Sequence, residues 1–165
     1  MLKNLEANKA IKRMAKEITI EELQLALAEK LSNCSIDKIS YNITCWELRF
    51  IHPHGNEYLL TASEIFVPNI EKWWSGICGL PVDIKNTNQA EDTIAAINIF
   101  TVLNKWPVSN VLLDSSGELL FTFSNGIKFG ISAVVENVDW TWQFISLASG
   151  IIITCDSGAL YESYQ

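Results

Sequence analysis

A period of two in the apolar residues is the feature that most constrains the fold of this chain. Residues 46–50 alternate between large apolar and charged side chains, and the alternation resumes at 58–60 after the turn-forming stretch 52–56. Alternate side chains of a β-strand point to opposite faces of its sheet, so this period is typical of a strand with one buried face. The segment therefore predicts an antiparallel hairpin.

The second half of the chain contains the same kind of pattern. An apolar run at 111–113 is followed by alternating apolar residues in 119–123 and 127–131, and Asn125-Gly126 separates the last two segments. An Asn-Gly pair between two alternating runs is a strong signal for a type I′ hairpin turn. These residues predict a three-stranded meander, and two more strands are predicted near 140–144 and 151–155.

Two helices are expected, one ahead of each group of strands. Thr19 and Glu22 form a capping-box pattern, and the apolar residues that follow lie on one helical face, which predicts a helix over 19–32. A second helix is predicted over 91–105, apolar on most sides and hence buried, because Pro107 ends the helical pattern.

Residues of the two halves coincide when the chain is compared with itself at a separation of about 71. The identical positions include Glu47-Leu48 with Glu118-Leu119, Phe50 with Phe121, Gly55 with Gly126, and Ala62 with Ala133. We interpret this as an internal duplication over 19–85 and 92–161 within a single domain, 1–165. The predicted fold class is α+β, with two related helix-plus-antiparallel-meander halves that share one core.

Composition supports a folded domain outside the membrane. Of 165 residues, 48% are hydrophobic and only 19% are charged, which argues against general disorder. No apolar run reaches the roughly 18 to 20 residues that span a bilayer, and the first residues lack the apolar core of a signal peptide. We expect a cytoplasmic protein with no membrane partner.

Charge is distributed unevenly along the sequence. The net charge is −7, yet the first sixteen residues hold five basic residues against one acidic residue, so the remainder carries −11. This negatively charged remainder of the chain repels phosphate backbones and attracts basic surfaces. Direct binding to nucleic acid is therefore disfavoured, and a basic protein partner is favoured.

The residue types needed for most enzyme mechanisms are missing or poorly spaced. There is no Gly-x-Ser-x-Gly elbow and no glycine-rich phosphate loop, and the two histidines, His52 and His54, share one turn. The four cysteines contain no C-x-x-C pair, so a zinc ribbon is excluded. We expect no enzymatic turnover, no cofactor and no metal site. An unfamiliar enzyme that uses carboxylates is not ruled out by the sequence, and neither is a ligand-binding or scaffold module lined by tryptophans.

Two segments of the second half carry a resemblance to a known class of protein. The chain resembles small bacterial immunity-type proteins, which accompany secreted polymorphic or contact-dependent toxins, mainly over residues 93–161. The segments concerned are Val135-Glu136-Asn137-Val138-Asp139-Trp140-Thr141-Trp142 and Thr154-Cys155-Asp156-Ser157-Gly158. The resemblance implies a non-catalytic protein that neutralises a cognate toxin domain by occluding its active site.

Charge and resemblance together give a predicted binding surface. Toxins that attack nucleic acid are commonly basic because they must hold phosphate, so an acidic inhibitor would compete for the same patch. The candidate partner-binding charges are Glu136, Asp139 and Asp156, with Trp140 as an apolar neighbour. Strand alternation places Asp139 and Trp140 on opposite faces, so an exposed carboxylate there predicts a buried indole. The sequence does not predict the oligomeric state.

Overall fold

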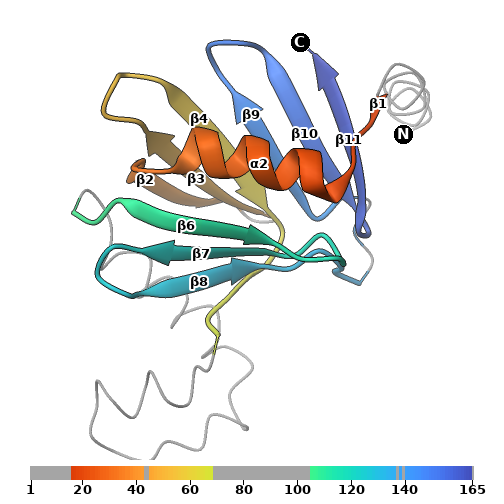
Figure 1. Ribbon diagram of the computed structural model, residues 1–165. Helices are drawn as coiled ribbons and strands as arrows, with labels where there is room; N and C mark the ends of the chain where they lie inside the picture. The colour runs from red at the N-terminus through yellow and green to blue at the C-terminus, as the bar shows by residue number, and fades with distance from the viewer. Residues whose placement is uncertain (1–15, 43–44, 69–104, 137, 139, 165) are drawn as a thin grey trace, which may run out of the picture.

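The computed structural model describes residues 16–42, 45–68, 105–136, 138 and 140–164 (Figure 1). Strands make up 52% of this part of the chain, which contains a single helix, α2 (Ile20–Leu31). The strands are β1 (Lys16–Glu17), β2 (Ser35–Asn42), β3 (Cys45–Ile51), β4 (Glu57–Ala62), β5 (Ile65–Phe66), β6 (Val108–Leu113), β7 (Leu119–Phe123), β8 (Lys128–Ile131), β9 (Trp142–Ser146), β10 (Ile151–Asp156) and β11 (Ala159–Tyr164).

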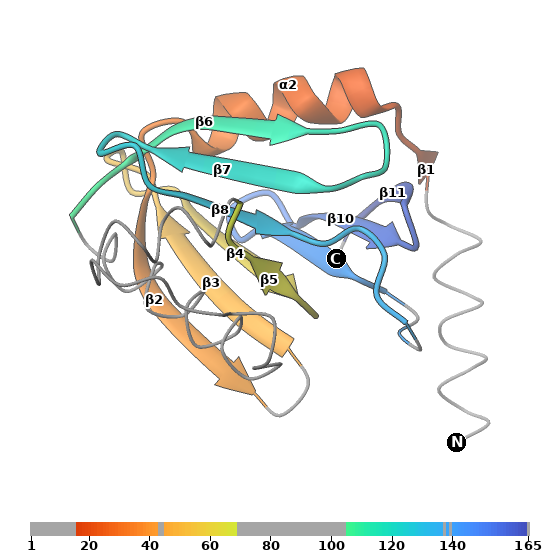
Figure 2. The same ribbon diagram turned by 90° about the horizontal axis from the view of Figure 1, so that it is seen from below.

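The strands form two antiparallel sheets. The larger sheet has the order β1-β11-β10-β9-β4-β3-β2, and the smaller has the order β5-β8-β7-β6. Figures 1 and 2 show α2 running alongside β6, so that α2 and the smaller sheet together cover one face of the larger sheet. The molecule therefore has two layers, and the second layer is a sheet extended by a helix.

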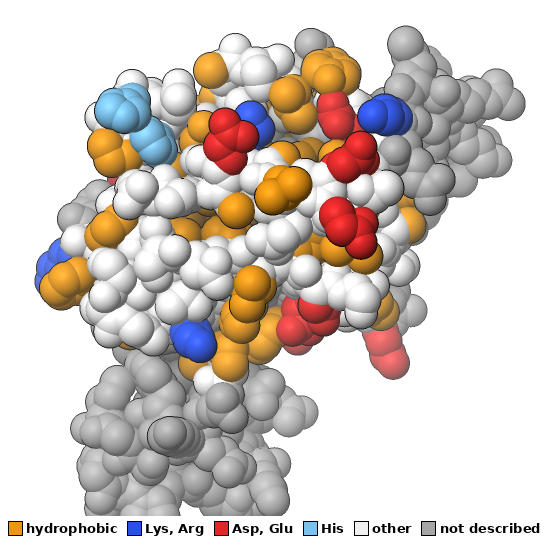
Figure 3. Space-filling model, in the orientation of Figure 1, with side chains coloured by type: hydrophobic (Ala, Val, Ile, Leu, Met, Phe, Trp, Pro, Cys, Tyr) orange, Lys and Arg blue, Asp and Glu red, His pale blue; other side chains and the backbone are white. Residues whose placement is uncertain are grey.

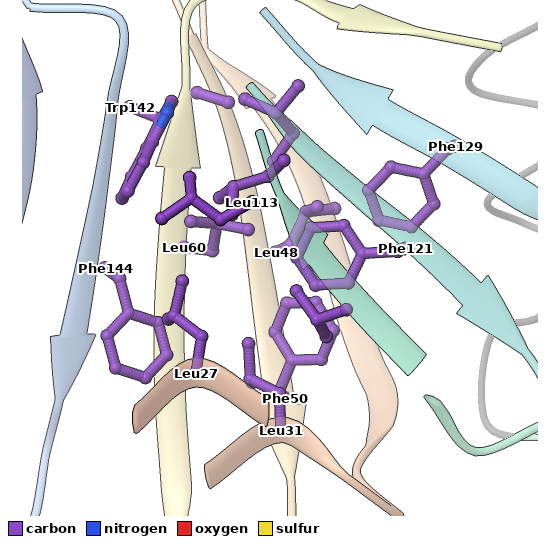
Figure 4. Close-up of a cluster of buried hydrophobic side chains, with 14 of the residues drawn as sticks. Leu27, Leu31, Leu48, Phe50, Leu60, Leu113, Phe121, Phe129, Trp142 and Phe144 are labelled. Atoms are coloured by element: carbon purple, nitrogen blue, oxygen red, sulfur yellow. The ribbon is translucent and has the colours of Figure 1, made fainter. Parts of the chain in front are cut away.

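The core fills the space between these layers. Phe121 of β7 stacks on Phe50 of β3, with ring centroids 5.6 Å apart, and on Phe129 of β8, 4.8 Å away. Figure 4 shows Leu27 and Leu31 reaching from α2 toward the same cluster. All five side chains are fully buried. The alternation seen in the sequence thus supplies one apolar face from each sheet.

The helix α2 confirms the helix predicted over 19–32. The Thr19 side chain accepts a hydrogen bond from the Glu22 backbone N–H at 3.2 Å, and the Glu22 carboxylate accepts one from the Thr19 N–H at the same distance. This reciprocal capping satisfies two backbone donors that a helix start would leave without partners. Leu23, Leu27 and Leu31 form the buried stripe.

The hairpin predicted from the first half and the meander predicted from the second are confirmed as β3–β4 and β6–β7–β8. The turn type predicted at Asn125-Gly126 is wrong. Gly126 has φ +85°, but Asn125 is not among the described residues with positive φ, and the Gly126 N–H donates to the Phe123 carbonyl at 2.8 Å. This is a type I turn followed by a glycine bulge. A type I′ turn occurs instead between β10 and β11, where Ser157 and Gly158 both have positive φ.

The predicted fold class is contradicted by the sheet topology. The described chain is mostly β and forms two antiparallel sheets, and this does not fit an α+β fold of two helix-plus-meander halves. Residues 142–164 do not pack as part of a second half, because β9 pairs with β4 and so continues the sheet of the first half. Period-two alternation identifies a strand but carries no information on its partner. The helix predicted over 91–105 lies outside the described residues, apart from Lys105.

The separation of 71 residues nonetheless relates two hairpins with equivalent turns. Gly55 donates its N–H to the His52 carbonyl at 2.8 Å, as Gly126 does to Phe123 at the same distance. The β3–β4 and β7–β8 hairpins therefore share a turn geometry, although they belong to different sheets. The duplication itself stays a prediction.

Candidate functional site

Three connections meet at the end of the molecule where α2 begins. The indole N–H of Trp142 in β9 donates to the carbonyl of Gly117 in the β6–β7 turn at 2.8 Å. The Thr141 hydroxyl donates to the carbonyl of Ala133 in the β8–β9 loop, also at 2.8 Å. Ile18, just ahead of α2, donates its N–H to the carbonyl of Leu160, the second residue of β11, at 3.4 Å. These bonds hold the two layers together at this end.

Two glycines permit the close approach of the β6–β7 and β10–β11 turns. Gly117 has φ +88°, and a Cβ atom there would lie 3.2 Å from the Cys155 sulfur. A Cβ atom at Gly158 would lie only 2.8 Å from the Ser116 carbonyl oxygen. Only glycine therefore fits at these two positions, where the two turns touch, and the polar residues beside them face the surface.

Carboxylates gather at the same end. Figure 3 shows acidic side chains over the start of α2 and the β6–β7 turn, on the right of the view. We define the acidic end by the carboxylates of the α2 start, the β6–β7 turn, the β8–β9 loop and the end of β10. They belong to Glu21, Glu22, Asp114, Glu118, Glu136 and Asp156, all of them exposed or half-buried. Lys16 in β1 is a basic residue close to them, because its charge lowers the pKa of Glu22 in addition to the stronger effect of the Thr19 hydrogen bonds.

Several basic residues lie toward the opposite end. Asn33, just after α2, donates its N–H to the carbonyl of Val108 at 2.9 Å, which places the last turn of α2, with Lys30, beside the start of β6. Lys105 precedes β6, and Lys128 begins β8. These basic residues lie away from the acidic end, although Glu29 stands next to Lys30 in the last turn of α2.

Asp114 is fixed within the acidic end by its own turn. Its Oδ1 atom accepts hydrogen bonds from the Ser116 N–H at 2.8 Å, the Ser116 hydroxyl at 2.6 Å and the Glu118 N–H at 2.9 Å. Partial burial alone would raise the pKa of Asp114, but these hydrogen bonds outweigh it and lower that pKa. The pKa of Glu118 is raised by burial and by the neighbouring charge of Asp114. Asp114 is thus a firmly ionised group of this surface.

The predicted partner-binding residues are only partly brought together. Glu136 is exposed in the β8–β9 loop, and Asp156 is half-buried at the end of β10 opposite Ala159. Trp140 is 36% exposed, whereas Trp142 is fully buried. Alternation does not extend back to Trp140 because β9 begins at Trp142. Asp139 lies outside the described residues.

Sequence reasoning missed the exposed apolar side chains around these carboxylates. Val134 in the β8–β9 loop is 65% exposed, Leu25 of α2 is 72% exposed and Leu112 of β6 is 49% exposed. A signal existed for Leu25, since it falls outside the stripe of α2 leucines at positions 23, 27 and 31. For Leu112 no sequence signal existed, because it stands within an unbroken run of apolar residues, 111–113.

Local contacts or burial restrict the chemistry of one histidine and two cysteines. The Nδ1 atom of His52 accepts a hydrogen bond from the His54 backbone N–H at 3.2 Å, so this nitrogen is already engaged. Burial raises the pKa of the Cys34 thiol to about 11 and also raises that of Cys155, which keeps both thiols protonated. In the part of the chain that the structure describes, no three His, Cys, Asp or Glu side chains are grouped to hold a metal ion.

Comparison with known proteins adds no relative to this description. None of the described helices has the length and apolar character needed to cross a membrane. Because no relative is available for comparison, the function of the acidic end is inferred from its own geometry. No protein-family model, curated protein or solved structure matches this chain.

Proposed function

We propose that this protein is a non-catalytic inhibitor that binds a basic toxin domain through its acidic end and occludes the toxin's active site. The observation that carries the proposal is the gathering of carboxylates at one end of the second layer. Complementary charge steers association and suppresses wrong partners. A toxin that cleaves nucleic acid needs a basic surface to hold phosphate, and the acidic end would compete for that surface.

Exposed apolar side chains among the carboxylates support a protein as the partner. Trp140 and Val134 lie in the same loop as Glu136. Protein interfaces commonly combine aromatic anchors at the centre with a polar rim, and tryptophan is enriched among the residues that contribute most to affinity. A small anion or cation would make no use of these side chains.

The test first asks whether a gene beside that of this protein encodes a toxin domain, and then follows the association rate of that domain with the immobilised protein at low and high salt. Replacing both Glu136→Gln and Asp156→Asn should slow association by about three- to tenfold at low salt, and the difference should shrink at high salt because ions screen the charges. Trp140→Ala should act mainly on dissociation, accelerating it by about tenfold.

A matched control separates position from total charge. Glu47→Gln with Glu57→Gln removes the same charge from the outer face of the larger sheet, where Glu47 bonds to Ser40 and Glu57 lies 3.4 Å from Arg49. This pair should leave the association rate unchanged within about twofold. Equal effects of the two pairs, or no binding by the wild type, would refute the proposal.

A further inference from the structure

Two exposed leucines flank the junction between α2 and β6. The Gln24 carboxamide donates from Nε2 to the Val111 carbonyl at 2.7 Å and accepts at Oε1 from the Leu113 N–H at 2.5 Å. Those two backbone groups lie on either side of Leu112. Leu25 is the residue next to Gln24, and Leu112 lies between the two residues of β6 that Gln24 bonds.

Both leucines point to the solvent side of the second layer. On α2 the leucines at 23 and 27 are buried against the larger sheet, which directs Leu25 outward. On β6, Val111 and Leu113 are buried and Leu112 between them is exposed. Figure 3 views the molecule from the side of α2 and β6 and shows separate hydrophobic side chains there with acidic ones around them. Single exposed leucines need no explanation, but two at one fixed junction form a pair.

Carboxylates surround this pair. Glu21, Glu22 and Glu29 lie one helical turn before or after Leu25, and all three are exposed. Asp114 follows Leu112 by two residues and is held ionised by its turn. We call Leu25, Leu112 and these four carboxylates the α2–β6 patch. An apolar centre with a charged rim is the usual anatomy of a protein interface.

We propose that the α2–β6 patch binds a basic amphipathic segment of a protein partner, with apolar side chains against Leu25 and Leu112 and Lys or Arg side chains against the carboxylates. The inference rests on the proposed function and names the surface on which the partner is anchored. Charge complementarity identifies the occupant. A second copy of this chain is disfavoured because a two-fold contact would bring the carboxylates of both copies together, and a nucleic acid would be repelled.

The first experiment uses two peptides of about 14 residues that contain only Leu and Lys in equal composition. One places its leucines on a single helical face, and the other distributes them around the helix. In about 150 mM NaCl, the one-face peptide should bind the full chain about tenfold more tightly than the other, because only it can contact both leucines at once. Leu25→Ser with Leu112→Ser should bring the two affinities within about twofold of each other. Both positions are exposed, so unfolding curves should show that this variant remains folded. Equal binding of the two peptides by the wild type, or a preference that survives the double substitution, would overturn the inference.

A second comparison locates the charges. Glu21→Gln with Glu29→Gln and, separately, Glu47→Gln with Glu64→Gln remove the same charge from the patch and from positions outside both the patch and the acidic end. Only the first pair should weaken binding of the one-face peptide, by about fivefold. If the second pair has the larger effect, the anchor lies elsewhere and the inference is wrong, while binding of the toxin through the acidic end would still stand. If the peptide results are as expected but no toxin domain binds, the proposed function is wrong, whereas the inference that the patch binds a basic amphipathic segment still holds.

Discussion

Replacing Gln24→Met tests how α2 is joined to the edge of the smaller sheet. Methionine keeps the length of the side chain and its apolar stem but makes neither of the hydrogen bonds to Val111 and Leu113. A buried backbone group without a partner costs about 1 to 3 kcal/mol. Both bonds are part-buried, so water compensates for some of this loss and we expect the lower part of the range. The free energy of unfolding should fall by about 2 to 3 kcal/mol in total.

The assay is equilibrium unfolding in urea, together with hydrogen exchange of the Leu113 amide. The dependence on urea concentration should be unchanged, because the surface exposed on unfolding is nearly the same. The Leu113 amide should lose protection, while amides of the central strands keep theirs. Leu25→Ala, at the exposed neighbouring position, is the control and should alter stability by no more than about 0.5 kcal/mol. A Gln24→Met protein as stable as this control would refute the reasoning.

Gln24→Glu adds a dependence on pH to the same test. One oxygen of the new carboxyl can still accept from the Leu113 N–H, but the other faces the Val111 carbonyl. The ionised form is therefore disfavoured, and the folded-state pKa of the new group should rise above its unfolded value of about 4.3. A group with a raised pKa stabilises the folded state at low pH, and this contribution is lost as the pH rises through the folded-state pKa. The stability deficit relative to wild type should be smaller at about pH 4 than at pH 7; equal deficits would contradict the assigned contacts.

Three further predictions concern the core and the turns. Phe121→Ala should lower the free energy of unfolding by about 3 to 5 kcal/mol, since the ring is fully buried between two others; a loss below about 1 kcal/mol in urea unfolding would contradict this packing. Gly117→Ala should cost more than Gly55→Ala by about 1 to 2 kcal/mol, because φ is nearly the same but only Gly117 faces other atoms; equal losses would mean that the contact is unimportant. The lowered pKa of Asp114 stabilises the folded state above its unfolded pKa of about 3.9, and this contribution is lost as the pH falls through the folded-state value. The stability advantage of wild type over Asp114→Asn should therefore shrink between pH 7 and pH 3 in urea titrations, and a constant difference would refute the role of its charge.

Local structure could be predicted from the sequence where a single segment contains the whole signal. Thr19 and Glu22 specify the start of α2 by themselves, and the alternation through residues 46–60 specifies a hairpin. The partner of β4 could not be predicted, because pairing with β9 depends on residues far apart in the sequence. The interpretation of the two halves as repeats of one helix-plus-meander unit led to the wrong fold class.

The residues of the candidate site could likewise be predicted from the sequence only in part. The acidic bias could be predicted from charge counts, and it pointed to Glu136 and Asp156. The α2–β6 patch could not, because the contact of Gln24 with β6 joins elements more than eighty residues apart. A glutamine on an amphipathic helix is ordinarily read as a solvent-facing residue. Its role becomes visible only when the edge of the smaller sheet lies beside it.

The pairing of β4 with β9 also determines when this protein can fold. Leu60 lies opposite Phe144 in the middle of the larger sheet. During synthesis β4 must therefore wait until residues 142–146 have left the ribosome, whereas β6, β7 and β8 are neighbours in sequence and can pair as soon as they emerge. Contacts of such high sequence separation slow folding and leave the inner face of β3 and β4 open to other chains in the meantime. Premature termination before β9 would remove the partner strand of β4 and leave an apolar, aggregation-prone edge at the centre of the larger sheet.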